Sequence, residues 1–252
     1  MGAMAASADA TASSMGEDSR VARWAGTFGI AGFAVFLIAL PLYSIGPQPA
    51  ARVDDSVAFA ASVGAARWVV LLRASIADPL MMASFVVFLA GFRHLIREAR
   101  PALEWMSTLV FGAGLVVLTL VLIGDGLQAG AALVPTGAAD PGAIAGLWVT
   151  SFVFHDAIGL IFAALLLASA GSATLASGVL QRWTGWFAIG AAVVNLLAAP
   201  SIFGGTDYTA FYSASGYVTL IAQGLLVLWF AIAGVSMFNI GRRRKAAPAL
   251  DR

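Results

Sequence analysis

Six stretches of this chain are each long and apolar enough to cross the hydrocarbon core of a lipid bilayer, which takes about 20 residues of helix. Only helices and closed barrels satisfy every backbone hydrogen bond in lipid, and barrel strands alternate apolar with polar residues, whereas these stretches are uniformly apolar. The sequence therefore predicts an all-α integral membrane protein. The predicted spans are 24–45, 67–92, 105–128, 144–170, 183–201 and 216–239.

The composition agrees with a membrane protein and excludes several chemistries. Of the 252 residues, 60% are hydrophobic and 11% are charged, against about 25% charged in a soluble domain. The absence of cysteine excludes disulfides, iron–sulfur clusters and thiolate zinc sites, and the two histidines are too few for an all-histidine metal site. No phosphate-loop or dinucleotide motif occurs. We expect no metal and no cofactor, and, because the basic residues stand at segment ends rather than in a dense patch, no nucleic-acid partner.

The basic residues predict the orientation of the spans. One side of the predicted membrane carries ten of them, and the other carries Arg52 and Arg67. The positive-inside rule places the richer side in the cytoplasm. The ten residues are Arg20, Arg23, Arg93, Arg97, Arg100, Arg182, Arg242, Arg243, Arg244 and Lys245. Both termini are then cytoplasmic, and the spans form three hairpins that start inside.

Three parts of the chain follow from this reading. We expect a disordered N-terminal tail over residues 1–20, a six-helix transmembrane domain over 21–241 and a basic cytoplasmic tail over 242–252. Tryptophan begins the first, third and fifth spans, as interfacial anchors do. A composition rich in alanine and arginine, with a single lysine, is typical of a GC-rich bacterial genome, so we expect the bacterial cytoplasmic membrane.

The first and fifth spans begin alike. Arg23-Trp24-Ala25-Gly26 corresponds to Arg182-Trp183-Thr184-Gly185 at an offset of 159 residues, and the same offset relates Pro41 to Pro200. Trp105 begins the third span almost midway between them. The pattern predicts that the first and third hairpins arose by duplication. Convergence of helices that all start on the same side is the alternative.

Polar residues gather in one layer of the predicted bundle. With a helix rise of about 1.5 Å per residue, they fall in the outer half of their spans, and ionisable residues inside spans are functional candidates. Candidate catalytic residues are Asp78, Asp125, His155 and Asp156. Candidate substrate-binding residues are Arg73, Gln128, Trp148, Phe152, Asn195, Tyr208, Tyr212, Tyr217 and Gln223.

Several details bear on these candidates. The spacing of Trp148, Phe152 and His155 places them on one stripe of a helix, and the outer aromatic residues would roof a cavity. Asp78 precedes Pro79, which predicts a kink, and Asp125 stands where the third span is expected to leave the membrane. The alternative is that the polar layer only holds helices together, because such contacts are common between membrane helices.

Three functions fit this layer. The first is a membrane-embedded enzyme that uses carboxylate and histidine acid–base chemistry on a lipophilic substrate, as an isomerase, cyclase or hydrolase. The second is a proton-coupled transporter or channel, although the inner half shows no matching polar route. The third is a non-catalytic accessory or binding protein. In each case the expected partner is a membrane lipid or a lipophilic small molecule.

The opening Arg23-Trp24-Ala25-Gly26, the basic loop after the second span and the length over residues 20–240 carry one resemblance. In these features the chain resembles the six-span bacterial membrane proteins catalogued as domain of unknown function four-three-eight-six. That resemblance implies six helices in a bacterial inner membrane and no activity. The general layout is also similar to small integral-membrane terpene cyclases, with no shared motif.

Overall fold

A computed structural model describes residues 2–47, 55–134, 140–207, 209–214 and 216–246, with side chains from residue 17 to residue 242 within these ranges. The described residues are helical and contain no strand. The elements are α1 (Gly2–Ile45), α2 (Ser56–Ala65), α3 (Arg67–Leu72), η1 (Arg73–Ala77), α4 (Asp78–Ala99), η2 (Pro101–Leu103), α5 (Glu104–Leu133), α6 (Pro141–Phe152), η3 (Val153–Ile158), α7 (Gly159–Ser177), α8 (Arg182–Ala198), η4 (Ala199–Gly204) and α9 (Tyr217–Ala246).

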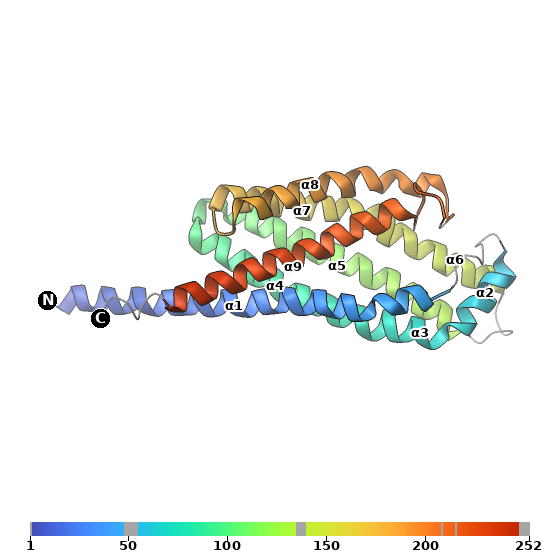
Figure 1. Ribbon diagram of the computed structural model, residues 1–252, viewed down its shortest axis with the longest axis horizontal. Coiled ribbons are helices and arrows are strands. Elements are labelled where there is room, and N and C mark those ends of the chain that lie inside the picture. Colours follow the sequence, from blue (N-terminus) through green and yellow to red (C-terminus); the bar gives the residue numbers. More distant parts are fainter. Residues whose placement is uncertain (1, 48–54, 135–139, 208, 215, 247–252) are drawn as a thin grey trace.

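Six of the described helical stretches are long and apolar enough to span a membrane. They are Glu17–Ile45, Arg67–Ala99, Pro101–Leu133, Pro141–Ser177, Arg182–Gly204 and Tyr217–Arg242. This confirms the prediction of a six-helix membrane protein. The helices run along one long axis, and both chain ends lie at the same end of the bundle (Figure 1). We call this the terminal end, and we call the opposite end, which carries α2, the α2 end.

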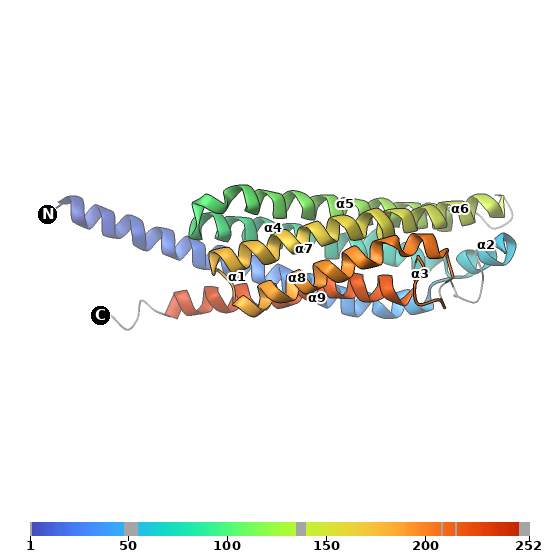
Figure 2. The same cartoon turned by 90° about the horizontal axis from the view of Figure 1, so that it is seen from above.

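The six spans form a closed ring in which each one packs on its neighbours in the sequence. The ring closes where α1 packs along α9, so the first and last helices of the chain are partners. The second helices of the three hairpins, α4, α7 and α9, also touch one another across the interior. Figure 2 shows the same bundle from above, with α4 and α7 between α5 and α9. Whether the hairpins were duplicated stays a prediction.

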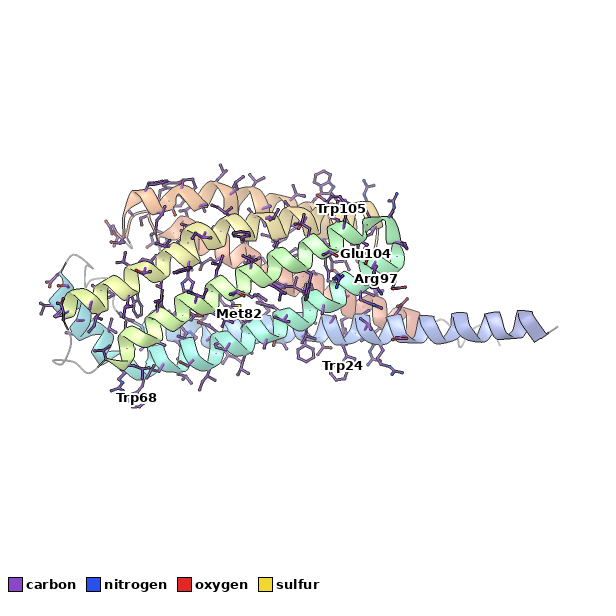
Figure 3. The ribbon with its side chains drawn as sticks, turned by 180° about the vertical axis from the view of Figure 1, so that it is seen from behind. Trp24, Trp68, Met82, Arg97, Glu104 and Trp105 are labelled. Atoms are coloured by element: carbon purple, nitrogen blue, oxygen red, sulfur yellow. The ribbon has the colours of Figure 1, made fainter. Side chains whose placement is uncertain are left out.

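The outer surface of the bundle is apolar, as a lipid-facing surface must be. Large apolar side chains are exposed on every spanning helix, among them Ile38, Leu80 and Leu196. Trp24 and Trp105 point outward near the terminal end, and Trp68 points outward near the α2 end (Figure 3). Tryptophan at both ends of a membrane bundle matches the two interfacial belts.

The middle of the bundle and its terminal end are filled by aromatic rings from α4 and α9. Phe85 stacks on Phe230 with ring centroids 4.0 Å apart, and Phe88 meets Trp229 edge to face at 5.7 Å. Phe92 also packs edge to face on Trp229, at 5.8 Å. Such buried ring pairs are worth about 0.5–1.5 kcal/mol each beyond the area that they bury. They make this part of the bundle a packed apolar core.

Three helical segments lie outside the predicted spans. Helix α1 begins at Gly2, within residues 1–20, and alanine, the strongest helix former, is frequent there. Helix α9 continues to Ala246 and so includes the start of the basic segment 242–252. Helix α2 lies between the first two predicted spans, and the Asp55 side chain caps it by accepting from the Ala58 N–H at 3.0 Å.

Helix α1 approaches α9 closely because both carry glycine at the contact. A Cβ atom at Gly26 would lie 2.5 Å from the Phe238 nitrogen and 2.6 Å from the Gly234 oxygen. A side chain here would therefore push two backbones apart rather than displace a flexible neighbour. Close approach through small residues is a common way for membrane helices to associate.

We expect Gly26→Ala to loosen the contact between α1 and α9 and to destabilise the protein by about 1–3 kcal/mol, the usual effect of overpacking. Thermal unfolding in detergent measures the effect. Gly112→Ala is the control, since a Cβ atom at Gly112 would meet nothing within 4 Å. Equal melting temperatures for the two variants would contradict this account of the contact.

Candidate functional site

The polar layer predicted from the sequence forms one connected cluster near the α2 end, with Arg73 at its centre. The guanidinium Nη1 lies 3.1 Å from Asp78 Oδ2 and 3.5 Å from Asp125 Oδ1, and Nη2 donates to the Gln128 side-chain oxygen. All four side chains are buried. One cation on η1 thus joins the start of α4 to α5 through two carboxylates and an amide.

Hydrogen bonds extend this cluster to two more helices. Tyr43 on α1 donates to Asp78 Oδ1 at 2.6 Å, and the Arg73 guanidinium carbon lies 4.8 Å from the centre of the Tyr43 ring. On the other side, Gln128 donates to Ser151 Oγ at 2.8 Å, and Ser151 donates to the Trp148 carbonyl at 2.6 Å. The cluster therefore ties α1, α4, α5 and α6 together.

Two π-helical segments carry the central residues. In η1 the Asp78 N–H bonds the Arg73 carbonyl, five residues back, and in η3 the Gly159 N–H bonds the Phe154 carbonyl in the same way. Pro79 follows the first segment and has no N–H for an ordinary helical bond. Gly159 ends the second, and a Cβ atom there would lie 2.5 Å from the Phe154 oxygen. Such single π turns are frequent at functional sites.

His155 projects from η3 toward α5. Its Nε2 lies 3.0 Å from the Val121 carbonyl oxygen, which only accepts, so Nε2 donates and the neutral ring keeps its lone pair on Nδ1. Asp125 Oδ1 lies 3.7 Å from the same Nε2. The imidazole fits there because Gly124 has no side chain, since a Cβ atom at Gly124 would lie 2.2 Å from Nε2.

A cavity of about 280 Å³ lies beside the cluster. His155 and Asp156 line it, and Gln223 of α9 donates to Asp156 Oδ1 at 2.7 Å. Trp148 and Phe152 form part of its wall, and Phe59 of α2 packs against Trp148 at a centroid distance of 5.8 Å. The complete lining is Leu42, Tyr43, Ser44, Gly46, Pro47, Val70, Arg73, Gln128, Trp148, Phe152, His155, Asp156, Thr219, Leu220 and Gln223.

Most predicted site residues meet in this region. Arg73, Gln128, Trp148, Phe152, His155, Asp156 and Gln223 line the cavity, whereas Asp78 and Asp125 lie behind Arg73 and are not among the lining residues. The helix α5 continues to Leu133, so Asp125 and Gln128 are buried inside a helix rather than placed at the end of a span.

Several predicted residues lie elsewhere. Asn195 donates to the carbonyls of Ala191 and Ala222, which ties α8 to α9 away from the cavity lining. The expected aromatic roof does not form from the described residues. Tyr212 donates to the Leu197 carbonyl, and Phe203, Phe211, Tyr212 and Tyr217 are exposed and do not line the cavity. Tyr208 lies outside the described residues.

Tyr43 is the site residue that the sequence analysis missed. It stands at the end of an apolar span, where tyrosine is usually an interfacial anchor. Its side chain is only partly exposed, and its hydroxyl turns inward to Asp78. The available signal was its level, because Tyr43 lies near the outer end of the first predicted span, as Asp125 and Gln128 lie near the outer end of the third.

Comparison with known proteins gives no relative for this chain, since no family model, no curated protein and no solved structure matches it.

We expect Arg73→Met to destabilise the protein strongly, because Asp78 and Asp125 would stay buried without their cation. Removing one partner of a buried ion pair costs about 3–5 kcal/mol. Unfolding in a denaturing detergent measures the loss. Arg67→Met is the matched control, since Arg67 begins α3 and lies over the exposed ring of Trp68. Similar losses for both variants would contradict a central role for Arg73.

We expect Gly124→Ala to displace the His155 imidazole, whereas Gly126→Ala should leave it in place, because a Cβ atom at Gly126 would meet nothing within 4 Å. Nitrogen NMR of ¹⁵N-labelled histidine measures the surroundings of the imidazole. The chain has two histidines, so the variant His94→Gln assigns their signals. Wild-type His155 should show a protonated Nε2 and an unprotonated Nδ1. An unchanged His155 signal in Gly124→Ala would contradict the close contact between Gly124 and the His155 imidazole.

Proposed function

We propose that this protein is a membrane-embedded enzyme of the bacterial cytoplasmic membrane that transfers protons on a lipophilic substrate, as an isomerase, cyclase or hydrolase. The observation that carries the proposal is that His155 and Asp156 both line one cavity at the α2 end. The positive-inside rule places that end in the outer half of the membrane, with both termini in the cytoplasm.

His155 has the features of a positioned general base. The hydrogen bond from Nε2 to Val121 holds the ring and leaves Nδ1 as the nitrogen that accepts a proton. Asp125, 3.7 Å from Nε2, supplies a carboxylate on the far side of the ring, where it stabilises an imidazolium once one forms. In many acid–base enzymes a histidine ring acts as the base, and a carboxylate behind the ring orients it and stabilises its protonated form.

Asp156 supplies the second proton-transfer group. It follows His155 in the chain, and Gln223 holds one of its oxygens by a hydrogen bond of 2.7 Å. When His155 takes a proton from one carbon and protonated Asp156 gives its own proton to another, a double bond moves with no cofactor. A proton that passes from the His155 imidazolium to the Asp156 carboxylate, directly or through water, then restores both groups. The remaining polar residues, Arg73 with Asp78 and Asp125, support the positions of these two groups.

The alternative of proton-coupled transport has one observation in its favour, the row of ionisable groups at Asp78, Arg73, Asp125 and His155. Such rows occur in proton relays. Transport also needs a route through the other half of the bundle. Among the described side chains that half is filled by Phe85, Phe88, Phe92, Trp229 and Phe230, so the enzyme is the better supported function.

We expect His155→Gln and Asp156→Asn to reduce turnover by at least about 100-fold, the lower range of acid–base catalysis. The assay incubates the protein in nanodiscs with bacterial lipid extract in D₂O and detects deuterium in products by mass spectrometry. His94→Gln is the control, because His94 lies at the terminal end and contacts Asp18 at 3.2 Å.

Two results would contradict the proposal. One is equal deuterium incorporation by wild type and His155→Gln. The other is a proton flux through protein-containing liposomes in the absence of substrate, which would favour transport instead. A drop in melting temperature for Asp156→Asn as large as the drop for Asp78→Asn would favour the reading in which the polar layer only holds helices together.

A further inference from the structure

Resting on the proposed function, we infer that the substrate is a single-chain amphiphile with a hydrogen-bond-donating head, such as a long-chain alcohol, and that it enters the cavity sideways from the lipid between α1 and α9. The head occupies the cavity beside His155 and Gln223, and the chain stays in the membrane.

The contact between α1 and α9 is tight over its terminal half. Gly26 and Gly29 of α1 lie against the backbone of Gly234, and the Ser19 hydroxyl donates to the Gly241 carbonyl at 2.9 Å. A Cβ atom at Gly241 would lie 2.8 Å from the backbone carbonyl oxygen of Ser19. No lipid chain passes between two backbones at such distances.

Toward the α2 end the same two helices separate around the cavity. Leu42 and Tyr43 of α1 line one side, and Thr219 and Leu220 of α9 line the other. Leu220 is 61% exposed and Tyr43 is 43% exposed, although the Tyr43 hydroxyl reaches buried Asp78. The cavity therefore opens on the lipid-facing side of the bundle, between the first and last helices.

The size of the cavity limits what it holds. Its volume of about 280 Å³ is just below the roughly 300–1,000 Å³ of pockets that enclose a whole drug-sized ligand. A lipophilic molecule with a long chain therefore cannot lie wholly inside: its head enters, and most of its chain stays outside. The chain has an apolar surface to follow outside, because Leu220 of the cavity wall is 61% exposed and the bundle surface carries other exposed apolar side chains, such as Ile38 of α1 and Ile221 of α9.

The chemistry of the inner wall selects the head. Gln223 donates one amide N–H to Asp156, and its oxygen is the acceptor that it offers to a ligand. His155 donates Nε2–H to Val121, so Nδ1 is left. Both atoms accept hydrogen bonds and neither donates. A hydroxyl head donates to these two acceptors, whereas an ether head of the same size has no hydrogen to donate to them.

Photolabelling tests this inference. The probe is a long-chain primary alcohol with a diazirine in its hydrocarbon chain, added to the protein in nanodiscs, and mass spectrometry locates the labelled peptides. We expect labelling on α1 and α9 near the α2 end, with competition by unlabelled alcohol. Leu220→Trp should reduce that labelling at least about fivefold by blocking the opening.

Ile221→Trp is the matched control, because Ile221 is 49% exposed and does not line the cavity. It should label as wild type does. The methyl ether of the same probe, which cannot donate, should label about five- to tenfold less, the effect of one or two net hydrogen bonds. Equal labelling by Leu220→Trp and Ile221→Trp would overturn the route, and equal labelling by ether and alcohol would overturn the head chemistry.

These failures are separable from a failure of the proposed enzyme. Labelling as expected, without deuterium incorporation, would support the amphiphile site and contradict the proposed enzyme. Turnover and labelling that are both unchanged in Leu220→Trp would support the enzyme and contradict the entry route.

Discussion

A guanidinium buried among membrane helices needs partners on every side, and the way Arg73 obtains them determines how the α2 end of this bundle is built. Its nitrogens reach Asp78, Asp125 and Gln128, and its face lies against the Tyr43 ring. These residues belong to three helices, α1, α4 and α5, and a shift of α4 or α5 would leave a charge unpaired in a medium that solvates it poorly. The ion cluster fixes the helices, and the helices then hold His155 and Asp156 at the cavity wall.

The two π turns allow membrane-spanning helices to direct several polar side chains into one cluster. Each turn inserts an extra residue into the helical repeat, so side chains before and after it point in directions that a regular helix would not allow. Pro79 and Gly159 mark the places where the chain tolerates this change, one by lacking an N–H and the other by lacking a Cβ atom. Arg73, His155 and Asp156 thus lie where the helix is irregular, next to regular helix on both sides.

The sequence predicted the six spans and the level of the polar layer well, because hydropathy and charge report directly on the bilayer. It also predicted that Trp148, Phe152 and His155 share one face, and all three line the cavity. It did not predict which polar residues face the cavity. Asp78 and Asp125 lie behind Arg73, and Asn195 binds backbone carbonyls instead. Those outcomes depend on helix rotation and on which helices are neighbours, and neither has a local signature. The turn of Tyr43 toward Asp78 is of the same kind. Pro79 predicted a kink, but a kink alone does not give the direction in which Asp78 points.

The pairing of α1 with α9 has a consequence for how the protein is made. The ribosome delivers the first helix long before the last, so α1 enters the membrane without the partner that its glycine face fits. Gln223 and Leu220, which complete the cavity, arrive only with that last helix. The cavity is therefore absent from every shorter nascent chain and appears in the same step that closes the ring, so a product truncated before α9 lacks the wall that Gln223 and Leu220 supply.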